Sequence, residues 1–130
     1  MPNVVFFSFS ETDREQVLVI KGRAVNPHYY NLDFRVQDLL SRWNTTDSAV
    51  IRRAISTSIN GTSRAIVFVG NDTSLSYWVP VEVEMTLEAH KPVYAIRING
   101  TSGATPACLS QNRISLHGWS EATLQELATR

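Results

Sequence analysis

The chain opens with Val4-Val5-Phe6-Phe7-Ser8-Phe9, an almost uninterrupted apolar run that a polar loop follows. A continuous run, as opposed to an alternation of apolar and polar residues, is typical of a strand buried on both faces. Two later runs, at residues 65–69 and 93–98, have the same character. The sequence therefore predicts buried strands at these positions, with residues 4–9 in the interior of the sheet.

Helical segments separate the apolar runs. The first helix, through residue 25, is capped by Thr12 or Asp13, and the second by Thr46 or Asp47, because short polar side chains accept hydrogen bonds from the first free N–H groups of a helix. Between the two helices, residues 32–36 alternate like a short strand. Strands that alternate with helices predict right-handed crossovers and a parallel sheet with helices on both faces.

Residues 75–90 carry two conflicting signals. Their apolar residues alternate from Val79 to Leu87, which by itself indicates a strand. However, Pro80 falls where the first turn of a helix would lie, and its missing N–H is not needed there. The distance along the chain to the next strand also suits a crossover helix. We therefore predict a helix that begins near Ser76 or Tyr77.

The carboxyl-terminal part has weaker patterns. Residues 100–117 are rich in Gly, Ser, Thr and Pro, which predicts a loop, and Ser120 then caps a final helix. We found no internal repeat. A chain of 130 residues can bury roughly two thirds of its unfolded surface, so we expect residues 1–130 to form one domain.

The composition excludes several classes of protein. The 12 basic and 12 acidic residues cancel, so nucleic acid and anionic membranes are not expected partners. Cys108 is the single cysteine, the three histidines lack the spacing of metal ligands, and the first apolar run is too short for an export signal. The sequence therefore predicts a cytoplasmic protein with no metal. It also contains no glycine-rich phosphate loop, which argues against a dehydrogenase or a nucleotide triphosphatase.

Trp78 and Glu82 are the candidate functional pair. Side chains four residues apart share one helix face, so an aromatic plane and a carboxylate would line the same small site. The loop after residues 4–9 would supply the other wall, at the ends of neighbouring strands. Two structural alternatives stay open: Glu82 is a favourable charge near the start of a helix, or Trp78 is a core aromatic.

Four segments resemble, in order and spacing, the TIR-like domains of the ThsB type, from the bacterial Thoeris anti-phage system. They are residues 5–13, 61–70, 78–82 and 93–98. The resemblance implies a flavodoxin-like, three-layer α/β fold with about five parallel strands and helices on both faces. In enzymatic members it also implies cleavage of NAD between nicotinamide and ribose, with NAD as a substrate and no cofactor.

By the same resemblance, Glu82 is the catalytic residue, and Phe9, Ser10 and Trp78 contact the substrate. Trp43 lines the same cleft or anchors a loop, and Phe9 is alternatively a packing residue. Pro80 and Val81 differ from the residues that often separate the tryptophan and the glutamate in the family, and residues 23–46 align poorly. These departures affect the loop that shapes the pocket and therefore the product.

The leading hypothesis is an NAD glycohydrolase or cyclase that makes a cyclic ADP-ribose-type signal during phage infection. Self-association and a downstream effector that senses the nucleotide are the partners this implies. The alternative is a catalytically silent TIR-like interaction module. A third possibility, nucleoside deoxyribosyl transfer, ranks last because the sequence offers no second cluster of carboxylates.

Overall fold

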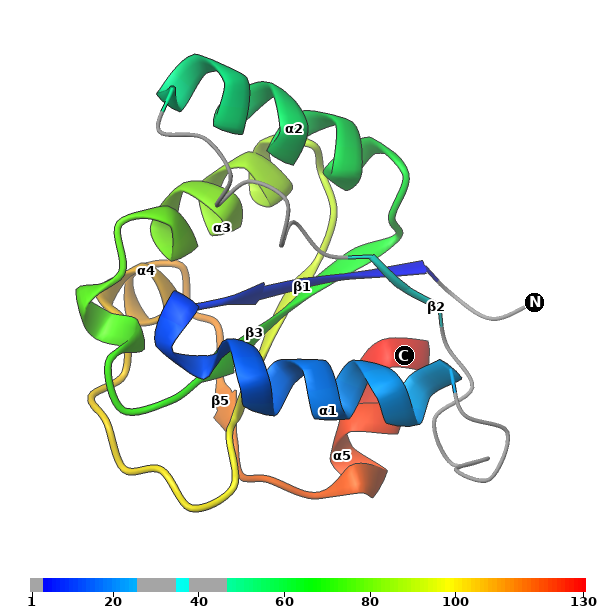
Figure 1. Cartoon of the computed structure of the whole chain (residues 1–130), viewed down its shortest axis with the longest axis vertical. Helices are drawn as coiled ribbons and strands as arrows, with labels where there is room; N and C mark the ends of the chain where they lie inside the picture. The colour runs from blue at the N-terminus through cyan, green and yellow to red at the C-terminus, as the bar shows by residue number, and fades with distance from the viewer. Residues whose placement is uncertain (1–3, 26–34, 38–46) are drawn as a thin grey trace.

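A sheet of five parallel strands forms the middle of three layers in the computed structural model, which describes residues 4–25, 35–37 and 47–130 (Figure 1). The strand order is β2-β1-β3-β4-β5, the order of flavodoxin-like folds. The strands are β1 (Val4–Phe9), β2 (Arg35–Gln37), β3 (Arg64–Val69), β4 (Val93–Arg97) and β5 (Leu116–His117). The predicted fold class is therefore confirmed.

The two strands that pair at the centre, β1 and β3, are also the most apolar. They run in parallel with Phe7 opposite Ile66, and all six residues of β3 are buried. Because successive side chains of a strand point to opposite faces, Phe6 enters the core on one side of the sheet and Phe7 the core on the other. The continuous apolar runs thus serve two cores at once, as the sequence predicts.

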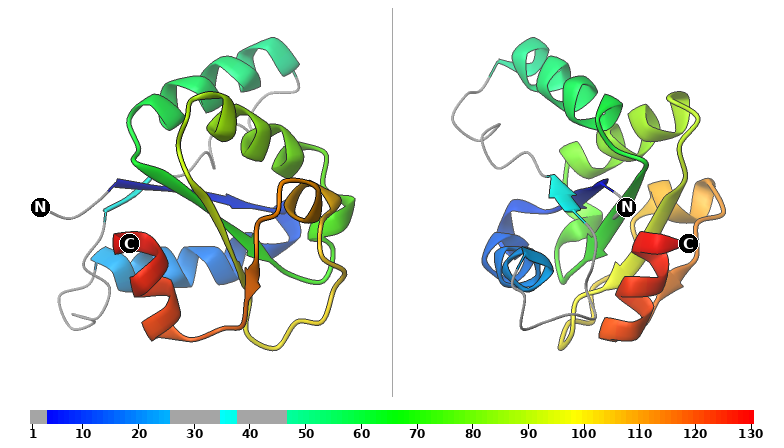
Figure 2. Two further views of the ribbon diagram at one scale, coloured as in Figure 1. Left: turned by 180° about the vertical axis from the view of Figure 1, so that it is seen from behind. Right: turned by 90° about the vertical axis from the view of Figure 1, so that its right-hand side faces the viewer.

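In the described part of the chain, five α-helices cover the two faces of the sheet (Figure 2). They are α1 (Arg14–Val25), α2 (Ser48–Asn60), α3 (Trp78–Glu88), α4 (Ala107–Gln111) and α5 (Glu121–Thr129), and short 3-10 turns, η1 (Glu11–Asp13) and η3 (Thr73–Leu75), precede α1 and α3. Apolar residues of α1 and α5 form one core with the sheet, and those of α2, α3 and α4 form the other. Across the described ranges, no helix has both the length and the apolar content needed to cross a bilayer.

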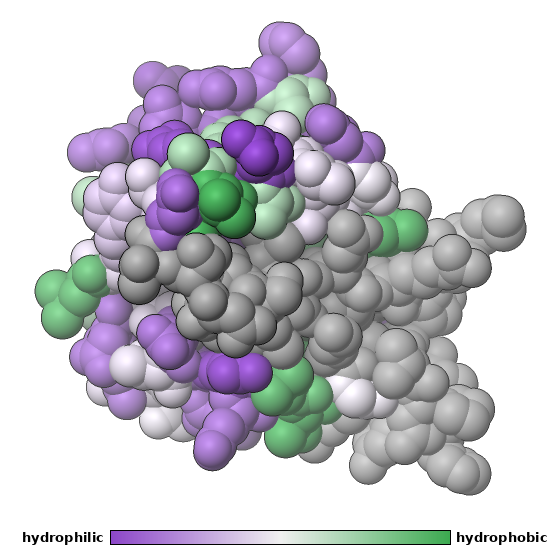
Figure 3. Space-filling view, turned by 45° about the horizontal axis from the view of Figure 1, so that its top comes forward, coloured by the Kyte–Doolittle hydropathy of each residue, from purple (hydrophilic) through white to green (hydrophobic). Residues whose placement is uncertain are grey.

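Local signals place most of these elements correctly. Pro80 is the third residue of α3, where its missing N–H does no harm, so residues 78–88 are helical despite their strand-like alternation. The side chain of Asp47 accepts hydrogen bonds from two backbone N–H groups at the start of α2. Over α2 the surface is mostly hydrophilic (Figure 3), and Arg52 and Arg53 are exposed there, as the amphipathic spacing of that helix indicates.

One prediction about secondary structure needs correction. Residues 100–117 are not only loop, because α4 and β5 lie within them. The short α4 is held by its fully buried Leu109, and β5 is two residues long and pairs with Ala95 and Ile96 of β4. Such short elements depend on tertiary contacts and leave no periodic pattern. The short strand predicted at 32–36 is β2, and residues 26–34 and 38–46 lie outside the described part.

The cap of α5 gives a test of this local account. The Oγ atom of Ser120 accepts a hydrogen bond of 2.9 Å from the N–H of Thr123, at the start of a helix that closes one core. We expect Ser120→Ala to lower the free energy of unfolding by about 1 kcal/mol, measured by urea denaturation. Ser56→Ala, at an exposed position in the middle of α2, is the control and should change it by less than about 0.5 kcal/mol. Equal effects of the two substitutions would contradict the assignment of Ser120 as the cap.

Candidate functional site

The strand order places a crevice at the carboxyl ends of β1 and β3. The chain leaves β1 toward α1 on one face of the sheet and leaves β3 toward α3 on the other, so the two loops diverge. In open α/β sheets, ligands bind at such a switch point. A pocket of about 400 Å³ lies here. Its described lining residues are Ser10, Glu11, Thr12, Asp72, Leu75, Ser76, Tyr77 and Trp78.

Two of the predicted site residues, Ser10 and Trp78, line this pocket together. Ser10 directly follows β1, and its hydroxyl group hydrogen-bonds with that of Thr12 at 3.1 Å. Trp78 is the first residue of α3 and is half-buried, and the ring of Tyr77 meets it edge-on with centroids 5.0 Å apart. Aromatic side chains from the start of α3 and a polar loop that follows β1 therefore line the same pocket.

Glu82 lies one helical turn after Trp78, on the buried side of α3. Its side chain is 0 % exposed, together with Val79 and beside Val83 and Thr86, and it is not among the described residues that line the pocket. Glutamate is almost never fully buried without a specific interaction, and even a well-paired buried carboxylate rarely adds more stability than an apolar residue of similar size. The burial of Glu82 is therefore not explained by stability alone.

Of the two other predicted substrate contacts, the structure describes Phe9 but not Trp43. Phe9 is fully buried in the core between the sheet and α1, so the described geometry favours the packing role that the sequence left open. Its backbone carries Ser10 into the pocket. Trp43 lies outside the described residues, and its role stays a prediction.

A polar link that the sequence does not predict lies beneath the pocket. Asp13, at the end of η1, is only 5 % exposed and accepts a hydrogen bond of 3.3 Å from the Thr73 hydroxyl. The same hydroxyl oxygen accepts a hydrogen bond of 2.8 Å from the N–H of Gly70, which follows β3. A Cβ atom at Gly70 would overlap the Asp13 carboxylate. The link therefore holds the two diverging loops together, and glycine is required where they touch.

The charged side chains in and beneath the pocket are mostly acidic. Burial raises the pKa of Asp13, the hydrogen bond from Thr73 opposes that rise, and the negative charge of Asp72 adds to it. Glu11 and Asp72 line the pocket, and none of its described lining residues is a lysine or an arginine. The pocket thus favours a cationic or neutral group. Within the described ranges, no three histidine, cysteine, aspartate or glutamate side chains lie close enough to hold a metal ion.

Comparisons with known proteins agree with this architecture. The family model of the Thoeris protein ThsB, TIR-like domain, matches residues 6–103, a range that includes the described lining residues and Glu82. The crystal structure of the TIR domain of the Toll-related receptor TRR-2 from the lower metazoan Hydra magnipapillata is similar in fold. It aligns with a TM-score of 0.59 and 16 % identity over 97 % of this chain and 91 % of that chain. No curated protein sequence matches significantly.

The buried carboxyl group of Asp13 predicts a pH dependence of stability. Since its pKa is raised in the folded state, the folded protein binds more protons than the unfolded chain at pH values just above the ordinary aspartate value of 3.8. This group therefore lowers the free energy of unfolding as the pH rises through that window. Asp13→Asn removes the titration, so the stability of the variant relative to the wild type should increase as the pH rises above 3.8.

Urea denaturation at several pH values measures this difference. The control is Glu88→Gln, at an exposed position of α3 away from the link. If the stability of Asp13→Asn follows that of the wild type in parallel at all pH values, the carboxyl group of Asp13 does not titrate as described.

Proposed function

The chain belongs to the family of TIR-like domains of the Thoeris protein ThsB, and from that premise we propose that it cleaves NAD at the bond between nicotinamide and ribose. One observation carries the proposal. Trp78 lines a pocket at the switch point of the sheet, and Glu82 follows it by one turn on the same helix. The family resemblance predicts this pair as the substrate contact and the catalytic carboxylate.

The charge of the pocket suits the reactive end of NAD. Nicotinamide in NAD is a cationic ring, and Glu11 and Asp72 line the pocket with carboxylates. In the proposed complex the ring stacks on Trp78, whose electron-rich face attracts a cation. Ser10 offers a hydroxyl group from the opposite loop. Phe9 supports that loop from the core, and Trp43 stays a predicted contact.

The bond between the anomeric carbon and the ring nitrogen breaks heterolytically. The electron pair goes to the nitrogen, nicotinamide leaves as a neutral molecule without needing a proton, and the ribose becomes oxocarbenium-like. The Glu82 carboxylate stabilises this positive charge and holds the ribose hydroxyl groups. In a buried environment the interaction is much stronger than in water. Because Glu82 is fully buried and is not among the described residues that line the pocket, we propose that substrate binding rearranges the Trp78 side of α3 and so exposes the carboxylate to the ribose.

Two nucleophiles can complete the reaction. Water gives ADP-ribose and releases one proton, whereas a hydroxyl group or ring nitrogen of the same ADP-ribose gives a cyclic product. A pocket walled by Trp78 limits the access of water, which favours the cyclic product. We propose that this nucleotide is the anti-phage signal and that a separate effector protein senses it.

Self-association is part of the proposal. Leu75 and Tyr77, at the rim of the pocket, are 82 % and 65 % exposed. Large apolar side chains exposed next to a site are typical of a surface that another protein covers. A second copy of the chain that covers them would close the pocket against water.

The direct test is to incubate the purified protein with NAD and to resolve nicotinamide, ADP-ribose and cyclic isomers by chromatography and mass spectrometry. Glu82→Gln keeps the size of the side chain but removes its charge, and it should reduce nicotinamide release about 100-fold to 1,000-fold. Glu84→Gln is the matched control, because Glu84 lies on the same helix but is exposed. Circular dichroism on both variants checks that they fold.

The outcomes separate the two hypotheses. Loss of turnover in Glu82→Gln alone supports the enzyme, and the second product peak identifies the isomer. Equal turnover in both variants excludes Glu82 as the catalytic residue. No turnover by the wild type, including after addition of lysate from phage-infected cells, favours the interaction module.

A further inference from the structure

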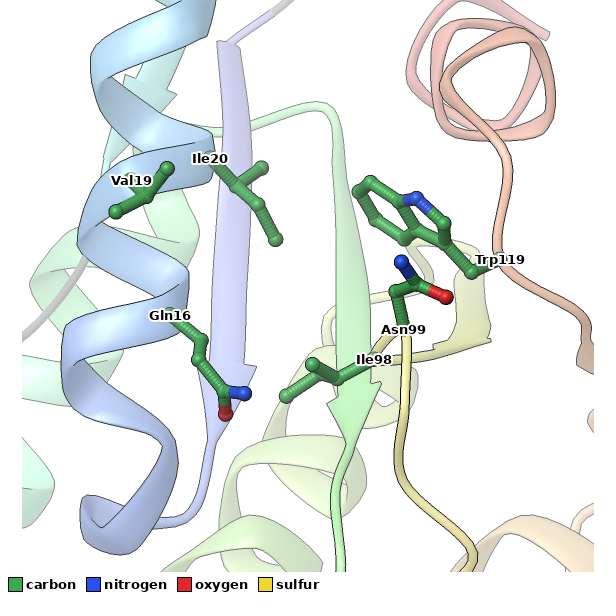
Figure 4. A pocket seen from close by; sticks show the side chains of 6 residues that line it. All are labelled: Gln16, Val19, Ile20, Ile98, Asn99 and Trp119. Atoms are coloured by element: carbon green, nitrogen blue, oxygen red, sulfur yellow. The ribbon is translucent and has the colours of Figure 1, made fainter.

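A second pocket lies on the opposite face of the sheet from α3, between α1 and the segments that follow β4 and β5 (Figure 4). Its volume is about 240 Å³, and its described lining residues are Gln16, Val19, Ile20, Ile98, Asn99 and Trp119. We propose that this pocket binds an uncharged adenine ring. The inference goes beyond the proposed function, because binding here requires no cleavage of NAD.

The walls of the pocket suit a flat ring. The Trp119 indole forms one side, and Ile20 points toward it from α1 (Figure 4). Trp119 is partly buried and packs against the core beneath α1 and α5, which fixes the plane of the indole. An indole on one side and an aliphatic side chain on the other suit a planar heterocycle at little entropic cost, because neither wall has to be ordered by the ligand.

The edges of the pocket suit the hydrogen-bonding groups of adenine. Gln16 and Asn99 contribute carboxamides, and both residues are exposed at the rim. In residues 4–25, 35–37 and 47–130, neither carboxamide makes a hydrogen bond, so both are available to a ligand. Each carboxamide both donates and accepts, which matches the adjacent amino group and ring nitrogen of adenine, the base that asparagine and glutamine recognise with two hydrogen bonds.

The charge and the size of the pocket restrict further which ligands it can bind. None of the described lining residues is charged, in contrast to the acidic pocket beside Trp78. A permanently cationic ring such as the nicotinamide of NAD therefore meets no carboxylate among these residues, unlike in the pocket beside Trp78. The volume is below the roughly 300 to 1,000 Å³ of sites for drug-sized ligands, so it accommodates one ring system while a sugar or phosphate stays in solvent.

The test is a titration of ¹⁵N-labelled protein with adenosine, followed by heteronuclear NMR. We expect saturable shifts of the Trp119 indole N–H signal and of the side-chain amide signals of Asn99 and Gln16. Trp119→Leu, which removes the stacking surface, should weaken binding about tenfold. Asn99→Ala changes only an exposed side chain and should weaken it about fivefold. Gln111→Ala removes an exposed carboxamide of α4 and should leave the affinity unchanged.

Two further measurements make the result decisive. N6,N6-dimethyladenosine keeps the flat ring but lacks the amino hydrogens, so it should bind about fivefold more weakly than adenosine. Glu82→Gln should bind adenosine with unchanged affinity, which separates this inference from the proposed catalysis. The inference is overturned if adenosine causes no saturable shifts, if the shifts appear at the indole of Trp78 instead of Trp119, or if Asn99→Ala and Gln111→Ala behave alike.

Discussion

β1 and β3 pair in parallel with Phe7 opposite Ile66, and the other elements are arranged around this pair. Both strands are buried on both faces, so helices must cover the sheet above and below. The chain leaves the two strands toward opposite faces, which opens a pocket at their carboxyl ends. The same apolar pairing that stabilises the protein therefore also determines where a ligand can bind.

Two buried carboxyl groups near this pocket have different explanations. Asp13 links η1 to the loop after β3 through Thr73 and Gly70, and so has a structural role. Glu82 is fully buried on the helix that also carries Trp78. Burial of a carboxylate is unfavourable unless specific interactions offset it, and an apolar side chain would serve a purely structural role at least as well. The proposed role in stabilising an oxocarbenium-like ribose gives this position a chemical reason.

The sequence predicts the parts of the molecule whose signals are local. The continuous apolar run of β1, Pro80 in the first turn of α3 and the Ser120 cap each depend on a few neighbouring residues. The two-residue β5 leaves no such signal, because its pairing with β4 joins distant segments. The same reason applies to the site. The loop that carries Ser10 and the helix that begins at Trp78 are expected together because they lie at the ends of neighbouring strands, and the family resemblance adds Ser10 as a substrate contact. The pocket at Trp119 joins three segments and has no local pattern.

A crystal structure with an NAD analogue in which a methylene group replaces the oxygen of the nicotinamide ribose would test the central claim most directly. The analogue cannot form the oxocarbenium-like species and should remain intact. The account predicts that the nicotinamide ring lies against Trp78, with the ribose hydroxyl groups within hydrogen-bonding distance of the Glu82 carboxylate. A dinucleotide bound away from Trp78, or a ribose that does not reach Glu82, would contradict it.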